Sequence, residues 1–248
     1  MKTLGVIGGI GPESTIEYYR LLMRAYRARV PDGSSPPILI NSINMKHLVT
    51  LIERDEFGKI TEYLVGEIQK LAAGGADCGL LSANTPHVVF DEISQRSPIP
   101  LVSIVEATCD AARASGLKRL GLFGTRFTMR GKFYPKVFSR TDIALVIPGL
   151  EEQAYIHDKY MNELVNGIVS PTTRAGLLAI VDRLKAEDHI DGLILGGTEL
   201  TLILGDAADH DIPFLDTSRI HAEAAAERLW SGRSARTTIR LHHKRTRT

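Results

Sequence analysis

The second half of the chain repeats the pattern of the first half, and this duplication restricts the folds that it can adopt. Three segments of the first half have counterparts in the second half: residues 4–15 (LGVIGGIGPEST) match 120–129 (LGLFGTRFTM), residues 75–85 (GADCGLLSANT) match 189–199 (HIDGLILGGTE), and residues 99–104 (IPLVSI) match 212–217 (IPFLDT). The offsets are 116, 114 and 113 residues, and the order is the same. The sequence therefore predicts two copies of one structural unit.

Each unit alternates short apolar runs with helical segments, which predicts an α/β fold. The runs GLLSA and GLILGG are apolar at consecutive positions, as in parallel strands that helices cover on both faces. Apolar residues at helical spacing predict helices over residues 13–29, 58–73, 129–140, 151–165, 172–185 and 218–230. We expect two pseudosymmetric lobes, each a parallel sheet flanked by helices. The carboxyl ends of both sets of strands then face one cleft, which is where such sheets bind ligands.

We place the first lobe at residues 1–116 and the second lobe at residues 117–211. Residues 212–230 form a final helix region that is expected to cross back to the first lobe. Residues 231–248 form a basic tail with six lysines and arginines and no acid, so the net charge of +1 conceals an acidic body. The tail has no aromatic residue to stack on a base, so we interpret it as a solvated, flexible extension and expect no nucleic-acid partner.

The composition favours a globular cytoplasmic protein with no membrane partner. The hydrophobic fraction is 44%, and no apolar run reaches the ~18 residues of a membrane span. The first twelve residues are too weakly apolar for a signal peptide, because glycines interrupt them. Cys78 and Cys109 are too few for a disulfide framework, and no cluster of His, Cys, Asp or Glu has the spacing of a metal site. We therefore predict no metal.

A glycine loop, with Gly8, Gly9 and Gly11, follows the first expected strand. It resembles a dinucleotide-binding loop, but the acid that should end the second strand about 20 residues later is absent from ILINSIN. A small anion at the backbone N–H groups of the loop is the favoured interpretation, and a tight turn alone is the alternative. Thr125 lies in the matching loop of the second half and is expected to add anion contacts.

Two polar loops follow equivalent strands in the two halves. The first contains Ala83, Asn84 and Thr85, and the second is 197–199, Gly197-Thr198-Glu199. Amide and hydroxyl groups suit a carboxylate ligand, so we predict that both loops bind substrate. His87 follows the first loop, where it is either a structural histidine or an acid/base group.

Five motifs, GVIGGIGPEST, SANTPH, GLFGTRFTM, GLILGGTEL and IPFLDTSRIHAEAA, occur together in this order. In this combination the chain resembles the aspartate/glutamate racemase family over residues 1–230. The resemblance implies a small carboxylate or acidic amino acid bound between the lobes. It also implies a homodimer and a reaction without pyridoxal phosphate or any other cofactor.

In the family that the chain resembles, each lobe supplies a cysteine thiol that moves the α-proton. The matching positions here are Ala83 and Gly197, and neither side chain carries an exchangeable proton. Cys78 lies five residues before Ala83, back in the strand, and Cys109 belongs to a different element. If the chain is active, we expect a non-thiol mechanism with Glu199 and His87 as the acid/base pair. Candidate cations for the substrate are Lys46, Arg126 and Lys159.

Several functions stay open at this point. The first is a racemase-type isomerase, and the second is a lyase, decarboxylase or cis–trans isomerase of small dicarboxylates. The third is a binding protein without catalysis. Engineered removal of the thiols is a further alternative, which glycine at position 197 disfavours because it is an unusual engineered change. Exchange of the α-proton with solvent separates the first function from the third.

Overall fold

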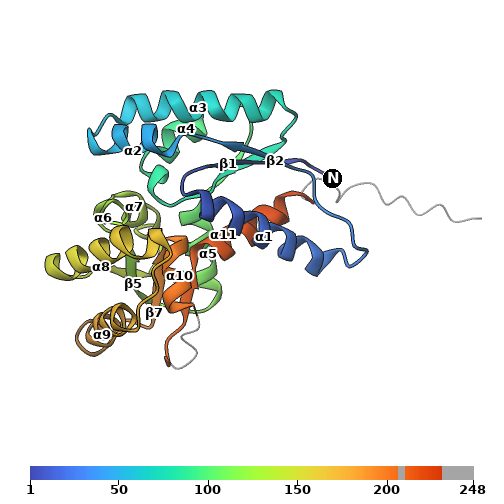
Figure 1. Ribbon diagram of the computed structural model, residues 1–248. Coiled ribbons are helices and arrows are strands. Elements are labelled where there is room, and N and C mark those ends of the chain that lie inside the picture. Colours follow the sequence, from blue (N-terminus) through green and yellow to red (C-terminus); the bar gives the residue numbers. More distant parts are fainter. Residues whose placement is uncertain (206–209, 231–248) are drawn as a thin grey trace, which may run out of the picture.

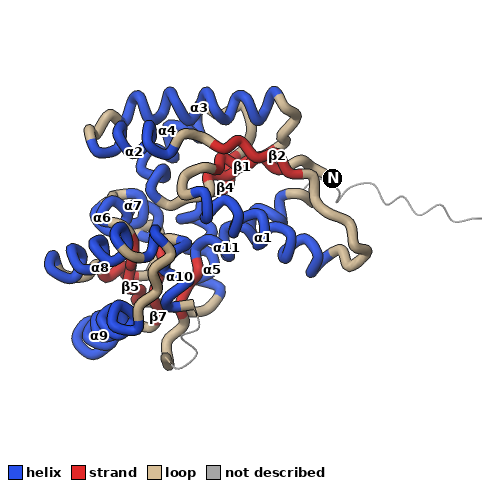
Figure 2. Tube along the Cα trace, in the orientation of Figure 1, coloured by secondary structure: helices blue, strands red, loops and turns tan. Residues whose placement is uncertain are grey.

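The computed structural model describes residues 1–205 and 210–230, and its strands form two four-stranded parallel sheets (Figures 1 and 2). The strands are β1 (Leu4–Gly8), β2 (Ile38–Ser42), β3 (Cys78–Leu81), β4 (Leu101–Val102), β5 (Arg119–Gly124), β6 (Ala144–Val146), β7 (Gly192–Gly196) and β8 (Phe214–Asp216). The strand order is β2-β1-β3-β4 in one sheet and β6-β5-β7-β8 in the other. Both sheets therefore place the second strand of the unit at one edge, which confirms the predicted two-lobed α/β fold.

Helices cover both faces of each sheet. They are α1 (Pro12–Arg29), α2 (Met45–Glu53), α3 (Phe57–Ala73), α4 (Phe90–Arg96), α5 (Ile104–Ala114), α6 (Arg126–Arg130), α7 (Phe133–Phe138), α8 (Leu150–Asn162), α9 (Pro171–Asp188), α10 (Thr198–Leu204) and α11 (Thr217–Arg228), with short 3-10 helices η1 (Thr85–Val89) and η2 (Leu164–Asn166). Leu80 in β3 and Leu193 in β7 are fully buried. Burial of each such leucine contributes about 1.5–3 kcal/mol.

The last helix of each half packs against the sheet of the other half. Ile104 and Val105 of α5 share a core cluster with Leu120 of β5. Ala222 and Ala225 of α11 share another cluster with residues of β1 and α1. Figure 1 shows α1, α5 and α11 between the two sheets. The packing of α5 and α11 on the opposite halves holds the two halves together. The lobe boundaries at residues 116 and 211 stay predictions. The basic tail lies outside the described residues.

Several helical segments differ from the expectation. The predicted helix over residues 129–140 is divided into α6 and α7, because Gly131 adopts an extended conformation that ends α6. Helices α2, α5 and α10 were not among the predicted helices. The side chain of Asn44 caps α2 by accepting a hydrogen bond from the backbone N–H of His47 at 3.2 Å, and Leu48 of α2 is fully buried. Helix α2 forms one wall of the cavity described next.

Candidate active site

A cavity of about 420 Å³ lies between the two halves. The loops after β1, β3, β5 and β7 contribute to its wall, as expected for the carboxyl ends of parallel strands. The predicted binding residues that line it are Ala83, Asn84, Thr85, Thr125, Gly197, Thr198 and Glu199. The two polar loops that the duplication singled out therefore meet at one cavity. Their role in binding substrate stays a prediction.

Gly8 and Gly9 do not line this cavity, although Gly11 from the same loop does. The backbone N–H of Gly9 donates a hydrogen bond to the hydroxyl of Thr15 at 2.8 Å, so it serves the loop itself. Gly9 has a φ of +76°, and a Cβ there would lie 2.7 Å from the backbone nitrogen of Ile43. Glycine is required at position 9 for this close packing. The structure thus gives Gly8 and Gly9 a structural place at the turn.

Glu199 lies at the centre of a group of hydroxyls on the cavity wall. The hydroxyl of Tyr160 donates to Oε2 of Glu199. Thr198 donates to the same oxygen at 2.8 Å, and Ser14 donates to Oε1 at 3.3 Å. The hydroxyl oxygens of Ser14 and Thr198 are also 2.5 Å apart, so α1 of the first half and the start of α10 of the second half meet here. A carboxylate with several hydroxyl donors is held in one orientation, as acid/base chemistry requires.

The phenol of Tyr160 occupies the space next to Gly197 where a side chain would lie. A Cβ at Gly197 would meet the Tyr160 hydroxyl and would lie 2.6 Å from Cε2 of its ring. Burial, followed by the nearby carboxylate of Glu199, raises the pKa of Tyr160 well above its usual value. The phenol therefore keeps its proton. At the second predicted thiol position, the chain has a glycine with a protonated tyrosine beside it.

The first predicted thiol position has no such replacement within its own loop. Ala83 brings a methyl group to the cavity. The adjacent Asn84 is buried and braces the halves: its Oδ1 accepts from the hydroxyl of Tyr134 at 2.8 Å, and its Nδ2 donates to Thr217 at 3.1 Å. The two sides of the cavity are thus chemically unequal. The Glu199 side holds a carboxylate and a phenol, and the Ala83 side presents a methyl group.

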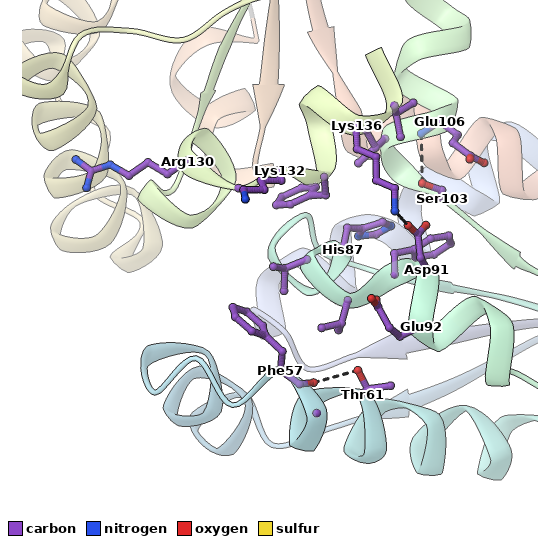
Figure 3. Close-up of a pocket in the computed structure, with 18 residues that line it drawn as sticks. Phe57, Thr61, His87, Asp91, Glu92, Ser103, Glu106, Arg130, Lys132 and Lys136 are labelled. Atoms are coloured by element: carbon purple, nitrogen blue, oxygen red, sulfur yellow. Dashed lines mark hydrogen bonds and ion pairs between the residues drawn. The ribbon is translucent and has the colours of Figure 1, made fainter. Parts of the chain in front are cut away.

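His87 does not line this cavity, so the structure does not bring the predicted pair of His87 and Glu199 together. It lies at a different cavity, of about 690 Å³, that also contains Asp91 and Lys136 (Figure 3). The backbone N–H of Ile104 donates to Nε2 of His87 at 3.1 Å, so Nδ1 carries the proton and donates to the carbonyl of Ala83 at 3.0 Å. Both ring nitrogens are used by the backbone, which makes His87 a structural residue.

Acidification from pH 7 to 5.5 is expected to destabilise the fold through His87 and His221. Burial is the main cause that lowers the pKa of His87 from 6.5 to about 3, and the nearby His221 adds to it. Burial lowers the pKa of His221 from 6.5 to about 4. Below pH 6.5 the unfolded chain takes up these protons while the folded chain does not. The free energy of unfolding therefore decreases as the pH is lowered. Each histidine is expected to lower the free energy of unfolding by about 1 kcal/mol over this range, measured by urea denaturation.

A His221→Gln variant tests whether His221 causes part of this pH dependence. Between pH 7 and 5.5 its free energy of unfolding is expected to fall by about 1 kcal/mol less than that of the unmodified protein, whatever its stability at pH 7. His47→Gln serves as the matched control, because it removes an exposed histidine in place of a buried one. An unchanged slope in His221→Gln would contradict the assignment.

Of the three candidate cations, the structure places Arg126 at the cavity. Lys46 and Lys159 do not line it, and Lys159 forms an ion pair with Glu163 at 2.6 Å. The guanidinium of Arg126 has no hydrogen-bond or ion-pair partner within residues 1–205 and 210–230. Its backbone N–H donates to Nδ1 of His157 at 3.2 Å, and His157 also lines the cavity. Arg126 is therefore available to a carboxylate ligand.

Sequence reasoning missed Ser14, His157 and Tyr160. Ser14 stands in the first turn of α1, directly after the glycine loop, so its position in the expected helix was a usable signal. His157 and Tyr160 lie three residues apart on α8 and thus share one face of that helix. The pattern of the sequence does not reveal that this face turns to the cavity.

Cys78 and Cys109 are buried and do not line the cavity. Burial raises the pKa of both thiols. Among the described residues, no group of three or more His, Cys, Asp or Glu side chains is arranged to hold a metal ion. Within residues 1–205 and 210–230, no helix combines the length and the apolar character of a membrane span.

The sequence and the structure were compared with those of known proteins, and both have relatives. The family model for Asp/Glu/Hydantoin racemase matches residues 7–225. The broad specificity amino-acid racemase RacX of Bacillus subtilis (strain 168) is 28% identical over 231 aligned residues, and the match covers 89% of this chain and 95% of RacX.

Two solved structures match 92% of this chain and 99% of their own chains. A Yersinia pestis protein assigned to the Asp/Glu racemases has a TM-score of 0.86 and 32% identity. An aspartate racemase homologue from Pyrococcus horikoshii OT3 has a TM-score of 0.81 and 30% identity.

Proposed function

The chain belongs to the Asp/Glu/Hydantoin racemase family, and from this premise we propose that it moves a proton at the carbon beside the carboxylate of a small amino acid or related acid. The substrate lies in the cavity between the halves. The reaction uses no thiol, because Ala83 and Gly197 stand at the two predicted thiol positions. The similarity to a broad specificity amino-acid racemase supports an amino acid as the substrate.

The observation that carries this proposal is the pairing of Glu199 with Tyr160 beside Gly197. The phenol of Tyr160 lies where a side chain at position 197 would lie, and its hydroxyl donates a hydrogen bond to the carboxylate of Glu199 on the cavity wall. In the proposed step Glu199 takes the α-proton, directly or through the Tyr160 hydroxyl. The C–H bond breaks, a carboxyl O–H bond forms, and the electron pair moves into the substrate carboxylate. Return of the proton completes the cycle.

Arg126 is proposed to bind the substrate carboxylate, on which negative charge accumulates in this step. Its guanidinium has no partner among the described residues, and it lines the same cavity as Glu199. A cation already in place stabilises the developing charge more than the starting substrate. Thr85 and Thr125 line the same cavity, and their hydroxyls are proposed to donate further hydrogen bonds to the carboxylate.

The methyl group of Ala83 favours a second candidate function. Racemisation needs proton transfer on both faces of the carbon, whereas the carboxylate and the phenol stand together on the Glu199 side. A reaction that delivers one proton from one face, such as that of a lyase or decarboxylase of small dicarboxylates, needs only this side. Products identified by mass spectrometry after incubation with small dicarboxylates distinguish this candidate from the first.

Proton NMR in D₂O tests the proposal. We expect that at least one amino acid loses its α-proton signal when it is incubated with the protein, because a working base exchanges that proton for deuterium. Chiral chromatography then separates racemisation from exchange on one face. Binding without exchange for every amino acid, seen by ligand-detected NMR, would instead indicate a binding protein and would contradict the proposed proton transfer.

The assembly and location of the chain also belong to this proposal. We propose a homodimer in the cytoplasm that acts without a cofactor and binds no nucleic acid or membrane. The family resemblance supports the homodimer and the absence of a cofactor, and the acidic body of the chain argues against a nucleic-acid partner. Light scattering of the purified protein measures its oligomeric state.

A further inference from the structure

We infer that the substrate of this site carries an apolar side chain rather than a second carboxylate. This inference rests on the proposed function and names the substrate class of the same cavity. It comes from the part of the wall that is formed by α2 of the first half and by α6, α8 and η2 of the second half. Figure 1 shows α2 opposite α6 and α8.

Helix α2 turns one apolar face to the cavity. Met45, Leu48, Val49 and Ile52 line it. Their spacing of three and four residues places them on one side of the helix. Lys46 and His47 point elsewhere, since both are exposed and neither lines the cavity. Leu48 and Ile52 are buried, so the half-buried Met45 and Val49 offer the hydrocarbon surface of the first half to a ligand here.

The second half meets this face with further apolar side chains that it leaves partly exposed. Phe127 of α6 and Met161 of α8 each expose 39% of their surface, and Val165 of η2 exposes 38%. All three line the cavity. The half-buried side chains of Met45 and Val49 on one wall and the exposed apolar side chains on the facing wall favour an apolar group between them, because its burial removes hydrocarbon surface from water on both sides.

The charges on the cavity wall oppose a substrate with two carboxylates. Arg126 is the one lysine or arginine of the described chain that lines the cavity, whereas both Glu53 and Glu199 line it as acids. Arg126 serves one carboxylate. A second carboxylate on aspartate or glutamate would then lie against the apolar face of α2 near Glu53, where it loses water without gaining a cation. A leucine, methionine or phenylalanine side chain avoids this penalty.

The test measures binding and α-proton exchange for both enantiomers of leucine, methionine, phenylalanine, aspartate and glutamate, by ligand-detected NMR and in D₂O. We expect the apolar amino acids to bind more tightly and to exchange faster than the acidic ones. Val49→Asn is expected to weaken the binding of the preferred apolar amino acid by about tenfold, because it places an amide on the apolar face. Thr50→Asn is the matched control, since Thr50 lies next in the same helix and does not line the cavity.

The outcomes separate the two levels of the proposal. Tighter binding of aspartate or glutamate, together with exchange, would overturn the apolar inference and leave the proposed proton transfer standing. Equal loss of binding in Val49→Asn and Thr50→Asn, with both variants folded by circular dichroism, would also overturn it. Absence of both binding and exchange for every amino acid would remove the proposed function and this inference with it.

Discussion

Replacement of Glu199 by glutamine is expected to slow α-proton exchange by about 10²–10⁴-fold, the usual contribution of a positioned general base. Glutamine keeps the shape of the side chain and an oxygen that accepts from Tyr160 or Thr198, but its amide does not take a proton. The binding constant is expected to change little, because Arg126 and the threonine hydroxyls hold the substrate carboxylate. The measurement is the exchange rate in D₂O with the amino acid that the unmodified protein exchanges fastest.

Glu53→Gln is the matched control for this variant. Glu53 is the other acid on the cavity wall and has no hydrogen-bond or ion-pair partner in the described part of the chain. Its replacement removes the same charge from the cavity without touching the Glu199 cluster, so exchange is expected to stay within about twofold of the unmodified rate, as for a screened surface charge. Equal loss of exchange in both variants would indicate a general electrostatic effect and would remove Glu199 from the role of base.

The duplication of the sequence determined how much of the fold was predictable. Strands such as β3 and β7 are apolar throughout because helices cover both faces of their sheets, and that pattern is visible without a structure. Nearly constant offsets then paired the loops after these strands. The meeting of Asn84 and Glu199 at one cavity followed from the rule that parallel strands bind ligands at their carboxyl ends.

The parts that were not predictable depend on contacts between distant segments. Tyr160 is separated from Glu199 by 39 positions in the sequence, and Ser14 is separated from it by 185 positions. No local sequence pattern therefore predicts either contact. His87 was ambiguous because its environment is decided by the backbone of Ile104 and by burial. Helix α2 has only nine residues, too few for a reliable helical period, although Asn44 was a visible capping residue.

Introduction of a cysteine at Gly197 is expected to destabilise the protein, because the new side chain and Tyr160 compete for one space. A Cβ at position 197 lies 2.8 Å from Cζ of the Tyr160 ring, well inside van der Waals contact. Overpacking of this kind is expected to lower the free energy of unfolding by about 3 kcal/mol. Tyr160→Ala alone leaves a cavity and is expected to lower it by a similar amount, about 3 kcal/mol.

The double variant Gly197→Cys with Tyr160→Ala tests whether these two residues replace one side chain. Each change fills or empties the same space, so together they are expected to destabilise the protein by at least ~1 kcal/mol less than the sum of the single changes, measured by urea denaturation. Gly196→Cys is the control. A Cβ at Gly196 lies 2.7 Å from the backbone oxygen of Phe123, which no side-chain truncation removes, so adding Tyr160→Ala does not relieve it. Additive effects at position 197 would show that Tyr160 does not occupy the place of a side chain there.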